Sequence, residues 1–381
     1  MVKTNNVSKD NFIIFFSKIF FINLIVLIFI IFFLELFARF AWTIKSCIFH
    51  IECNYKRISN LKIRDKNFMD KNIGLTKYHN FLGYVPQSGF DSIINLDGWD
   101  NKKVSILKDG FRSNDNQNYE SNKFLVVGDS FTFGDQVANN ETWPSCLERL
   151  KNVGIANGGV FGYGAAQAIR RALIESQKNN YEHLILSVLQ NSNFDRDKLI
   201  YRSGFPRPAV IEEDGLIKWE KVPKYGEPGS KFSYKTKLSF KNNLLTYGSE
   251  YSQIIGTIMY RFFPKYDYSG KNLTKRHPKA ATFKSIIYFT LKKFSEIPIR
   301  NKYLLFQYGA KDFEKHDKEL ISNVTYIKKI ARDLDIITID TYPYLKKELK
   351  QIDKRKIWFV EGHHTSFGND LVCDLINNNI E

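Results

Sequence analysis

The chain has 381 residues, 43% of them hydrophobic, which is enough apolar material for the core of one large domain or two small ones. Lysine and arginine total 56 against 40 acidic residues, giving a formal net charge of +16. The basic residues are scattered, and no zinc-finger, RNA-recognition or basic-zipper pattern accompanies them. We therefore expect no nucleic-acid partner, and a membrane surface or an anionic glycan is the more natural partner.

The first predicted element is a membrane-spanning helix at Ile19–Phe37. This segment contains only two polar residues and is long enough to cross the hydrocarbon core of a bilayer. Bulky Phe40 and Trp42 follow it instead of a small-residue cleavage site. We expect a short tail at residues 1–18 and an uncleaved transmembrane anchor at residues 19–42. More basic residues follow the segment than precede it, which by the positive-inside rule favours a cytoplasmic carboxyl-terminal domain. Long carboxyl-terminal domains are translocated largely regardless of charge, so the count does not decide the orientation.

Four cysteines are present. Cys47 and Cys53 lie close together just beyond the predicted anchor, and they are near enough in sequence to pair in an oxidising compartment. Cys146 and Cys373 fall in predicted helices, and we expect them to be buried helix residues.

The rest of the chain divides into an irregular segment and a segment in which strands alternate with helices. Residues 43–121 show no sustained periodicity, so we expect a juxtamembrane stalk and an accessory segment there. Residues 122–381 show the alternation, which is typical of an α/β fold with a parallel sheet between two helical layers. The alternation fails at about 197–300, where we expect an insertion that covers the carboxyl edge of the sheet. Strands are predicted at Lys123–Val127, Val153–Asn157, His183–Leu189, Tyr303–Gln307 and Asp335–Ile339, and helices at Glu141–Leu150, Ala165–Gln177, Lys315–Leu334 and Phe367–Asn378.

A candidate nucleophile follows the first predicted strand. In Phe124–Gly134, a run of apolar residues leads directly into Gly-Asp-Ser, which places Ser130 in a sharp turn at the carboxyl end of a buried strand. Ligands of open α/β sheets bind at this edge. A serine hydroxyl is a weak nucleophile without a base and oxyanion donors, so the rest of the chain has to supply both.

Three further motifs fall at the ends of later elements. The second strand leads into a glycine-dense loop, Asn157–Gly164, whose backbone N–H groups are able to approach an oxyanion closely. The third strand ends in a polar run that includes Asn193, a side-chain amide donor. Near the carboxyl terminus, Glu361 precedes the paired His363 and His364, which offer a base with a carboxylate beside it.

This set of motifs, in this order, resembles the SGNH or GDSL hydrolases, a family of serine esterases and acyltransferases. The resemblance covers residues 123 to 381 apart from the insertion, and it implies a flavodoxin-like three-layer α/β/α sandwich. We expect no metal, because the cysteines are distant from the histidine pair and no metal-ligand spacing appears, and we expect no other cofactor. The resemblance makes Ser130 the nucleophile and a donor to the oxyanion through its own backbone N–H. Gly162, five residues after Asn157, matches the family's oxyanion glycine, and Asn193 matches its amide donor.

The same resemblance assigns the base and the acid. The family has a glycine five residues after its catalytic histidine, and Gly368 stands in that relation to His363. Glu361 is then the acid. His364 remains an alternative base. If the family's acid and base are spaced three residues apart, Glu361 pairs with His364 instead of His363.

By resemblance we expect a membrane-anchored serine esterase that acts outside the cytoplasmic membrane on acylated envelope glycans. An O-acyltransferase that uses the same acyl-enzyme is one alternative. A non-catalytic glycan-binding or assembly protein on a decayed SGNH fold is another, because Asn191 and Phe194 stand where the family's third motif has Gly and Asp. The sequence does not specify the acyl group or the oligomeric state.

Overall fold

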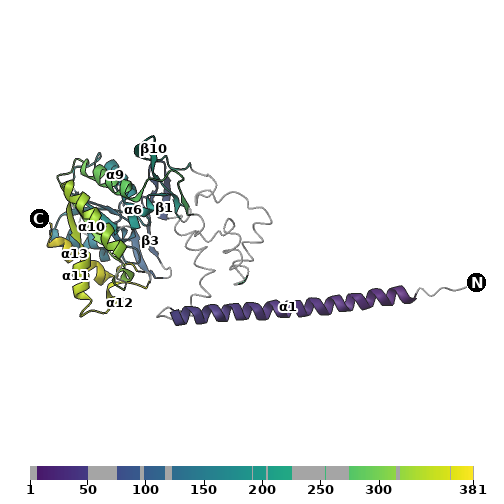
Figure 1. The fold of residues 1–381 in the computed structure, drawn as a ribbon. Helices are drawn as coiled ribbons and strands as arrows, with labels where there is room; N and C mark the ends of the chain where they lie inside the picture. The colour runs from purple at the N-terminus through teal and green to yellow at the C-terminus, as the bar shows by residue number, and fades with distance from the viewer. Residues whose placement is uncertain are drawn as a thin grey trace, which may run out of the picture. The chain divides into compact units, whose positions relative to one another are not determined.

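The computed structural model describes residues 7–49, 75–94, 98–115, 122–190, 192–202, 205–224, 254, 274–314, 318–360 and 362–380, with the side chains of the first helix described for residues 17–41. This first helix, α1, spans Val7–Phe49 (Figure 1). Its stretch Ser17–Ala41 has a mean hydropathy of 3.0 and is long and apolar enough to cross a membrane. A signal sequence near an N-terminus has the same length and composition, so this finding supports an anchor only weakly.

A five-stranded parallel sheet forms the centre of the second compact unit of the chain. The strand order is β14-β13-β7-β5-β6, so β7 is the middle strand and pairs with β13 on one side and β5 on the other. In chain order this is 2-1-3-4-5, the flavodoxin-like order, so the predicted fold class is confirmed. The five strands are β5 (Asn122–Gly128), β6 (Gly154–Gly159), β7 (His183–Leu189), β13 (Asn301–Gln307) and β14 (Ile337–Asp340).

Helices cover both faces of this sheet (Figure 1). Leu125 and Val127 of β5 point into a core formed with α5 (Ala165–Glu175), α9 (Phe283–Ser295) and α10 (Lys318–Asp333). The alternate residues Phe124 and Val126 point into the opposite core, formed with α4 (Trp143–Lys151) and α13 (Ser366–Asn377). Burial on both faces explains why these strands are continuous apolar runs in the sequence.

Helix α9 was not predicted, and it lies at the end of the range that the sequence analysis assigns to an insertion. Thr282 caps its first turn by accepting a hydrogen bond from the Ser285 N–H. Ile287, Leu291 and Phe294 follow at helical spacing and are fully buried. The helix therefore belongs to the core of the α/β domain. Before it come the short segments β8 (Leu199–Arg202), β9 (Phe205–Pro206), β10 (Val210–Glu213), β11 (Leu216–Trp219) and β12 (Lys275–Arg276), while residues 225–253 and 255–273 lie outside the described residues.

Part of the predicted accessory segment also packs on this domain. It contains two antiparallel hairpins, and Leu82 and Tyr84 of the first hairpin are buried in the core that contains α5. Arg112, farther along, donates its backbone N–H to the Asn157 carbonyl at 3.0 Å. The hairpins are β1 (Thr76–His79) with β2 (Gly83–Pro86) and β3 (Asp91–Ile94) with β4 (Lys102–Ser105); the remaining elements are α3 (Ser130–Phe133), η1 (Asn139–Glu141), α6 (Ser192–Arg196), η4 (Ala310–Phe313), α11 (Thr341–Glu348) and α12 (Lys354–Ile357).

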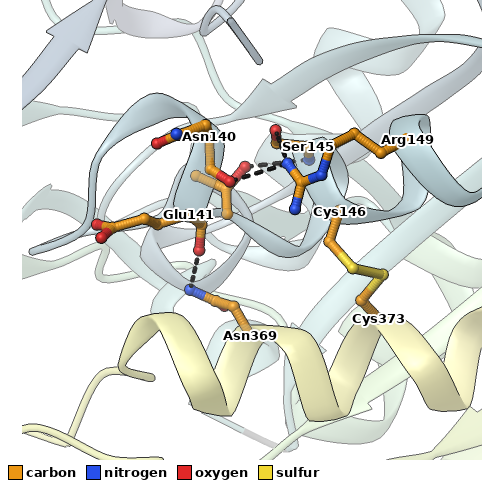
Figure 2. Close-up of a disulfide and its surroundings, with 8 residues drawn as sticks. Asn140, Glu141, Ser145, Cys146, Arg149, Asn369 and Cys373 are labelled. Carbon is orange, nitrogen blue, oxygen red and sulfur yellow. Dashed lines mark hydrogen bonds between the residues drawn. A yellow bond between two sulfur atoms is a disulfide. The ribbon is translucent and has the colours of Figure 1, made fainter. Parts of the chain in front are cut away.

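A disulfide joins Cys146 of α4 to Cys373 of α13 (Figure 2), with 6.1 Å between the Cα atoms. Both cysteines are buried, as the sequence analysis expects, but it did not foresee their bond. Asn369 of α13 adds a second link by donating its side-chain amide to the Glu141 carbonyl at 3.0 Å. Cys53 lies outside the described residues, so its predicted pairing with Cys47 stays a prediction.

Candidate active site

Ser130 is the first residue of the single-turn helix α3, which follows the inner strand β5 after one residue, Asp129. Asp129 caps this turn, because its carboxylate accepts a hydrogen bond from the Phe131 N–H at 3.1 Å. Trp143 of α4 donates its indole N–H to the Phe131 carbonyl, also at 3.1 Å. These bonds fix the backbone on both sides of the serine, whose residual exposure is 8%.

A buried arginine holds the turn that follows α3. Arg112 donates from its guanidinium to the backbone carbonyls of Phe133 and Val137, each at 2.6 Å, and to that of Gly134. It is 1% exposed, and burial lowers its pKa to about 10. Arg112 was not predicted as a site residue, because the carbonyls that it binds lie 21 to 25 positions away in sequence.

His363 reaches Ser130 from the last loop of the domain. Its Nε2 lies 3.0 Å from Ser130 Oγ, although the two residues are 233 positions apart in sequence. Its ring packs against that of Phe131, with 5.4 Å between the centroids. Burial lowers the pKa of His363 to about 4, an effect that the Asp129 carboxylate opposes. The ring is therefore a neutral base at ordinary pH.

The loop that carries His363 is fixed by its own backbone and by close packing of α13. Phe359 donates its N–H to the His363 carbonyl at 2.8 Å. A Cβ atom on Gly368 would stand 2.1 Å from the carbonyl oxygen of Ile357, so only glycine allows α13 to begin this close to the loop. This contact gives a physical reason for a glycine five residues after the histidine.

His364 occupies a different environment. It is 3% exposed and lies between the rings of Phe131 and Trp358, with centroid distances of 5.0 and 6.0 Å. Burial and, to a smaller extent, the neighbouring His363 lower its pKa to about 3. Of the two histidines, the structure therefore brings His363 to Ser130 and packs His364 in the interior.

The predicted acid, Glu361, lies outside the described residues. Two polar residues of the turn after α3 lie beside the His363 ring instead. Gln136 Oε1 is 3.1 Å from Nδ1, and Asp135 Oδ2 is 3.8 Å from Nε2. The sequence analysis missed both, although they follow the serine by only five and six positions.

The predicted oxyanion residues belong to one connected group. Gly162 adopts a left-handed φ of +78° in the glycine-dense loop, and its carbonyl accepts a hydrogen bond from Arg207 at 2.6 Å. Asn193 donates its side-chain amide to the Tyr163 carbonyl at 2.9 Å and accepts one from the Leu189 N–H at 2.5 Å. The amide of Asn193 thus ties the end of β7 to the loop that contains Gly162.

Positive charge surrounds this loop. Arg196 forms an ion pair with the fully buried Asp129 carboxylate at 2.7 Å and also donates to the Tyr163 carbonyl at 3.1 Å. The positive charges of Arg196 and Arg202 also lower the pKa of His363. The site therefore combines a serine, a neutral histidine and an electropositive wall, which is the equipment for nucleophilic attack on a carbonyl compound.

No family model and no curated protein matches the chain. Solved structures do, among them a member of the lipolytic protein G-D-S-L family from Veillonella parvula, with 12% identity, a TM-score of 0.36 and coverage of 66% of this chain and 94% of that one. An acetylxylan esterase from Geobacillus stearothermophilus has 11% identity and a TM-score of 0.36, covering 68% and 95%. A lipase/acylhydrolase from Enterococcus faecalis has 12% identity and a TM-score of 0.36, also covering 68% and 95%.

Proposed function

We propose that this protein is a serine esterase whose nucleophile is Ser130 and whose general base is His363. The observation that carries the proposal is the 3.0 Å hydrogen bond between Ser130 Oγ and His363 Nε2 at the carboxyl edge of the parallel sheet. A buried histidine with a lowered pKa is neutral and accepts the hydroxyl proton, which is what activation of a serine requires.

In the proposed reaction, Ser130 Oγ attacks the carbonyl carbon of an acyl ester while His363 Nε2 takes the hydroxyl proton. The tetrahedral intermediate then collapses, the bond to the alcohol breaks, and His363 returns the proton to the departing oxygen. Water attacks the acyl-Ser130 by the same steps in reverse.

The backbone N–H groups of Ser130 and Gly162 are the proposed oxyanion donors, each worth about 3 kcal/mol of the barrier. One N–H of the Asn193 side-chain amide donates to the Tyr163 carbonyl. The second N–H of the same NH2 group is the proposed third oxyanion donor.

The proposed substrate is an acylated glycan of the cell envelope, reached from a membrane anchor at residues 19–42 with the domain outside the cytoplasmic membrane. The net charge of +16 suits an acidic polymer, and the buried Cys146–Cys373 disulfide suits an oxidising compartment.

Labelling with a fluorophosphonate tests the catalytic assignment without knowledge of the natural ester. We expect the full chain to be labelled on Ser130 and to hydrolyse 4-nitrophenyl acetate, and Ser130→Ala and His363→Ala to lose both properties. Ser92→Ala, at an exposed serine, is the matched control and should behave as the parent. A Ser130→Ala protein that retains the parent rate would show that the assignment is wrong.

Acyl transfer uses the same acyl-enzyme, and the acceptor alone distinguishes it from hydrolysis. Mass spectrometry of a glycan incubated with enzyme and an acyl donor separates the two reactions, because transfer adds the mass of the acyl group. Absence of labelling together with retained glycan binding would instead favour the non-catalytic alternative.

A further inference from the structure

An amide, rather than a carboxylate, faces the second ring nitrogen of His363 in the described part of the chain. Gln136 Oε1 lies 3.1 Å from His363 Nδ1, and the Gln136 side chain is buried. An amide oxygen only accepts hydrogen bonds, so Nδ1 must carry the ring proton. Nε2 is then free of a proton and accepts the hydroxyl proton of Ser130, which is the tautomer that general-base catalysis requires.

The backbone and the side chain of Gln136 are both held in place by neighbouring residues. Its backbone has a left-handed φ of +71°, which is uncommon for a residue with a side chain and costs conformational free energy. Arg112 binds the carbonyls of Gly134 and Val137, on either side of Gln136. The other end of the amide is held against Gly98, since a Cβ atom there would stand 2.2 Å from Gln136 Nε2.

We propose that Gln136 is the positioning residue of the catalytic histidine and takes the role that the sequence resemblance gives to Glu361. This inference rests on the proposed function of Ser130 and His363. A neutral partner fixes the tautomer and the ring orientation but adds no negative charge to stabilise the protonated ring. The low pKa that burial gives to His363 is consequently not raised from this side.

Two substitutions of Gln136 test separately the length of its side chain and the absence of a charge on it. Gln136→Asn tolerates a left-handed backbone and keeps an amide, but it is one methylene too short to reach Nδ1. Gln136→Glu keeps the length and places a carboxylate beside Nδ1. Glu361→Gln tests the rival acid, and Gln177→Ala, at an exposed glutamine, is the control for a harmless change.

With 4-nitrophenyl acetate, we expect Gln136→Asn to lower kcat about 100-fold and to leave KM within about twofold. We expect Gln136→Glu to move the acid limb of the pH profile upward by about one pH unit or more, because an anion stabilises the protonated ring. Glu361→Gln and Gln177→Ala should match the parent. Parent-like kcat in Gln136→Asn, or an unmoved acid limb in Gln136→Glu, would overturn the inference, as would a loss in Glu361→Gln as large as that in Ser130→Ala.

Fluorophosphonate labelling of the parent distinguishes this failure from failure of the proposed function. An unlabelled, inactive parent overturns the serine assignment itself. A labelled parent whose labelling rate is unchanged in Gln136→Asn keeps the esterase and removes Gln136 from it. A loss of labelling rate in folded Gln136→Asn, shown by an unchanged circular dichroism spectrum, supports the positioning role.

A different observation concerns Arg202 of β8. Its Nη1 atom lies 2.8 Å from the place where a Cβ of Gly162 would stand, so the guanidinium borders the proposed oxyanion loop. Of the three arginines gathered here, Arg196 is paired with Asp129 and Arg207 donates to the Gly162 carbonyl. Among the described residues, no carboxylate lies within ion-pair distance of Arg202.

The electrostatics of Arg202 make an anion its natural partner. The charges of Arg196 and Arg207 add to burial in lowering its pKa to about 10, and its side chain is largely but not fully buried. A partly exposed guanidinium that two like charges repel is stabilised by a bound carboxylate or phosphate. We infer that the ester substrate carries such an anionic group close to the reacting carbonyl, which again rests on the proposed function.

Two esters that differ by one charge test this inference. The acetyl ester 4-acetoxybenzoate is an anion, and its methyl ester is neutral with the same position of the acetyl group. We expect the parent to prefer the anion in kcat/KM by about tenfold, and Arg202→Gln to remove that preference by raising KM for the anionic ester. Arg149→Gln, at an exposed arginine, is the matched control.

Equal losses for both esters in Arg202→Gln, through kcat, would make Arg202 an oxyanion donor and overturn the anionic-substrate inference. An unchanged preference in Arg202→Gln, or a parent without preference, would also overturn it. If the parent is labelled by fluorophosphonate in these cases, the esterase assignment survives independently.

Discussion

At the scale of single residues, the burial of His363 sets how the proposed enzyme responds to pH. Burial lowers the pKa of this ring to about 4, against 6.5 for a free histidine. Only the neutral ring accepts the Ser130 proton, and it is neutral above its pKa. We expect kcat/KM for 4-nitrophenyl acetate to be level from neutral pH down to about 4 and to fall below that. An acid limb near 6.5 would contradict the burial that the structure shows.

Arg112 provides a second prediction at this scale, on stability. Its guanidinium donates to three backbone carbonyls, and a lysine ammonium at the same place is too compact to reach all three. Unpaired buried carbonyls and a buried charge are costly, so Arg112→Lys should lower the free energy of unfolding by about 3 kcal/mol.

Chemical denaturation of Arg112→Lys measures this loss. Arg149→Lys, which also changes an arginine that donates to a backbone carbonyl but on the exposed face of α4, should stay within about 0.5 kcal/mol of the parent. Equal losses in the two variants would show that the burial of Arg112 is not the cause.

At the scale of elements, the sequence predicts what local pattern determines and misses what distant contacts determine. The five sheet strands are apolar runs ended by turn residues, and each was predicted near its observed bounds. Ser130 was located from its strand and turn, and His363 was predicted as its partner from the family resemblance and the glycine five residues after it. Helix α9 was missed because the chain before it is irregular, so the point at which strands and helices alternate again is not evident from the sequence.

The residues that complete the candidate site could not be read from local pattern. The contact of Gln136 with His363 spans 227 positions, and no periodicity or motif encodes a contact of that kind. The same separation of 227 positions hides the Cys146–Cys373 bond. In both cases the folded topology makes neighbours of segments that the sequence keeps apart.

The disulfide leads to a prediction about the two helices that it joins. Helix α4 follows the turn of Ser130, and α13 follows the loop of His363, so the bond connects the two supports of the site (Figure 2). Closing a long loop restricts the unfolded chain, and loss of such a bond costs about 2–5 kcal/mol. We expect a thiol reductant to lower both the melting temperature and the activity of the parent.

The double variant Cys146→Ala/Cys373→Ala is the control for this experiment. It should start from the lower melting temperature and show no further response to the reductant. A parent whose melting temperature is the same with and without reductant would contradict a stabilising role for the bond.

At the scale of the whole molecule, α1 and the disulfide together predict where the domain resides. Buried disulfides persist in oxidising compartments, whereas cytoplasmic thiols are kept reduced. Ser17–Ala41 is able to cross a membrane once, and long domains that follow such a helix are translocated largely regardless of charge. We therefore expect the amino terminus to face the cytoplasm and the α/β domain to lie outside it.

Thiol accessibility tests this arrangement in a Cys47→Ser/Cys53→Ser background, where only Cys146 and Cys373 remain. After denaturation of the membrane-bound protein, a maleimide mass tag should attach only when a reductant is present. Tagging without reductant would place the domain on the reducing side.

The mass of the protein separates an anchor from a signal sequence. An uncleaved chain keeps its 44.5 kDa and stays in the membrane after an alkaline wash, whereas a cleaved chain is lighter and soluble.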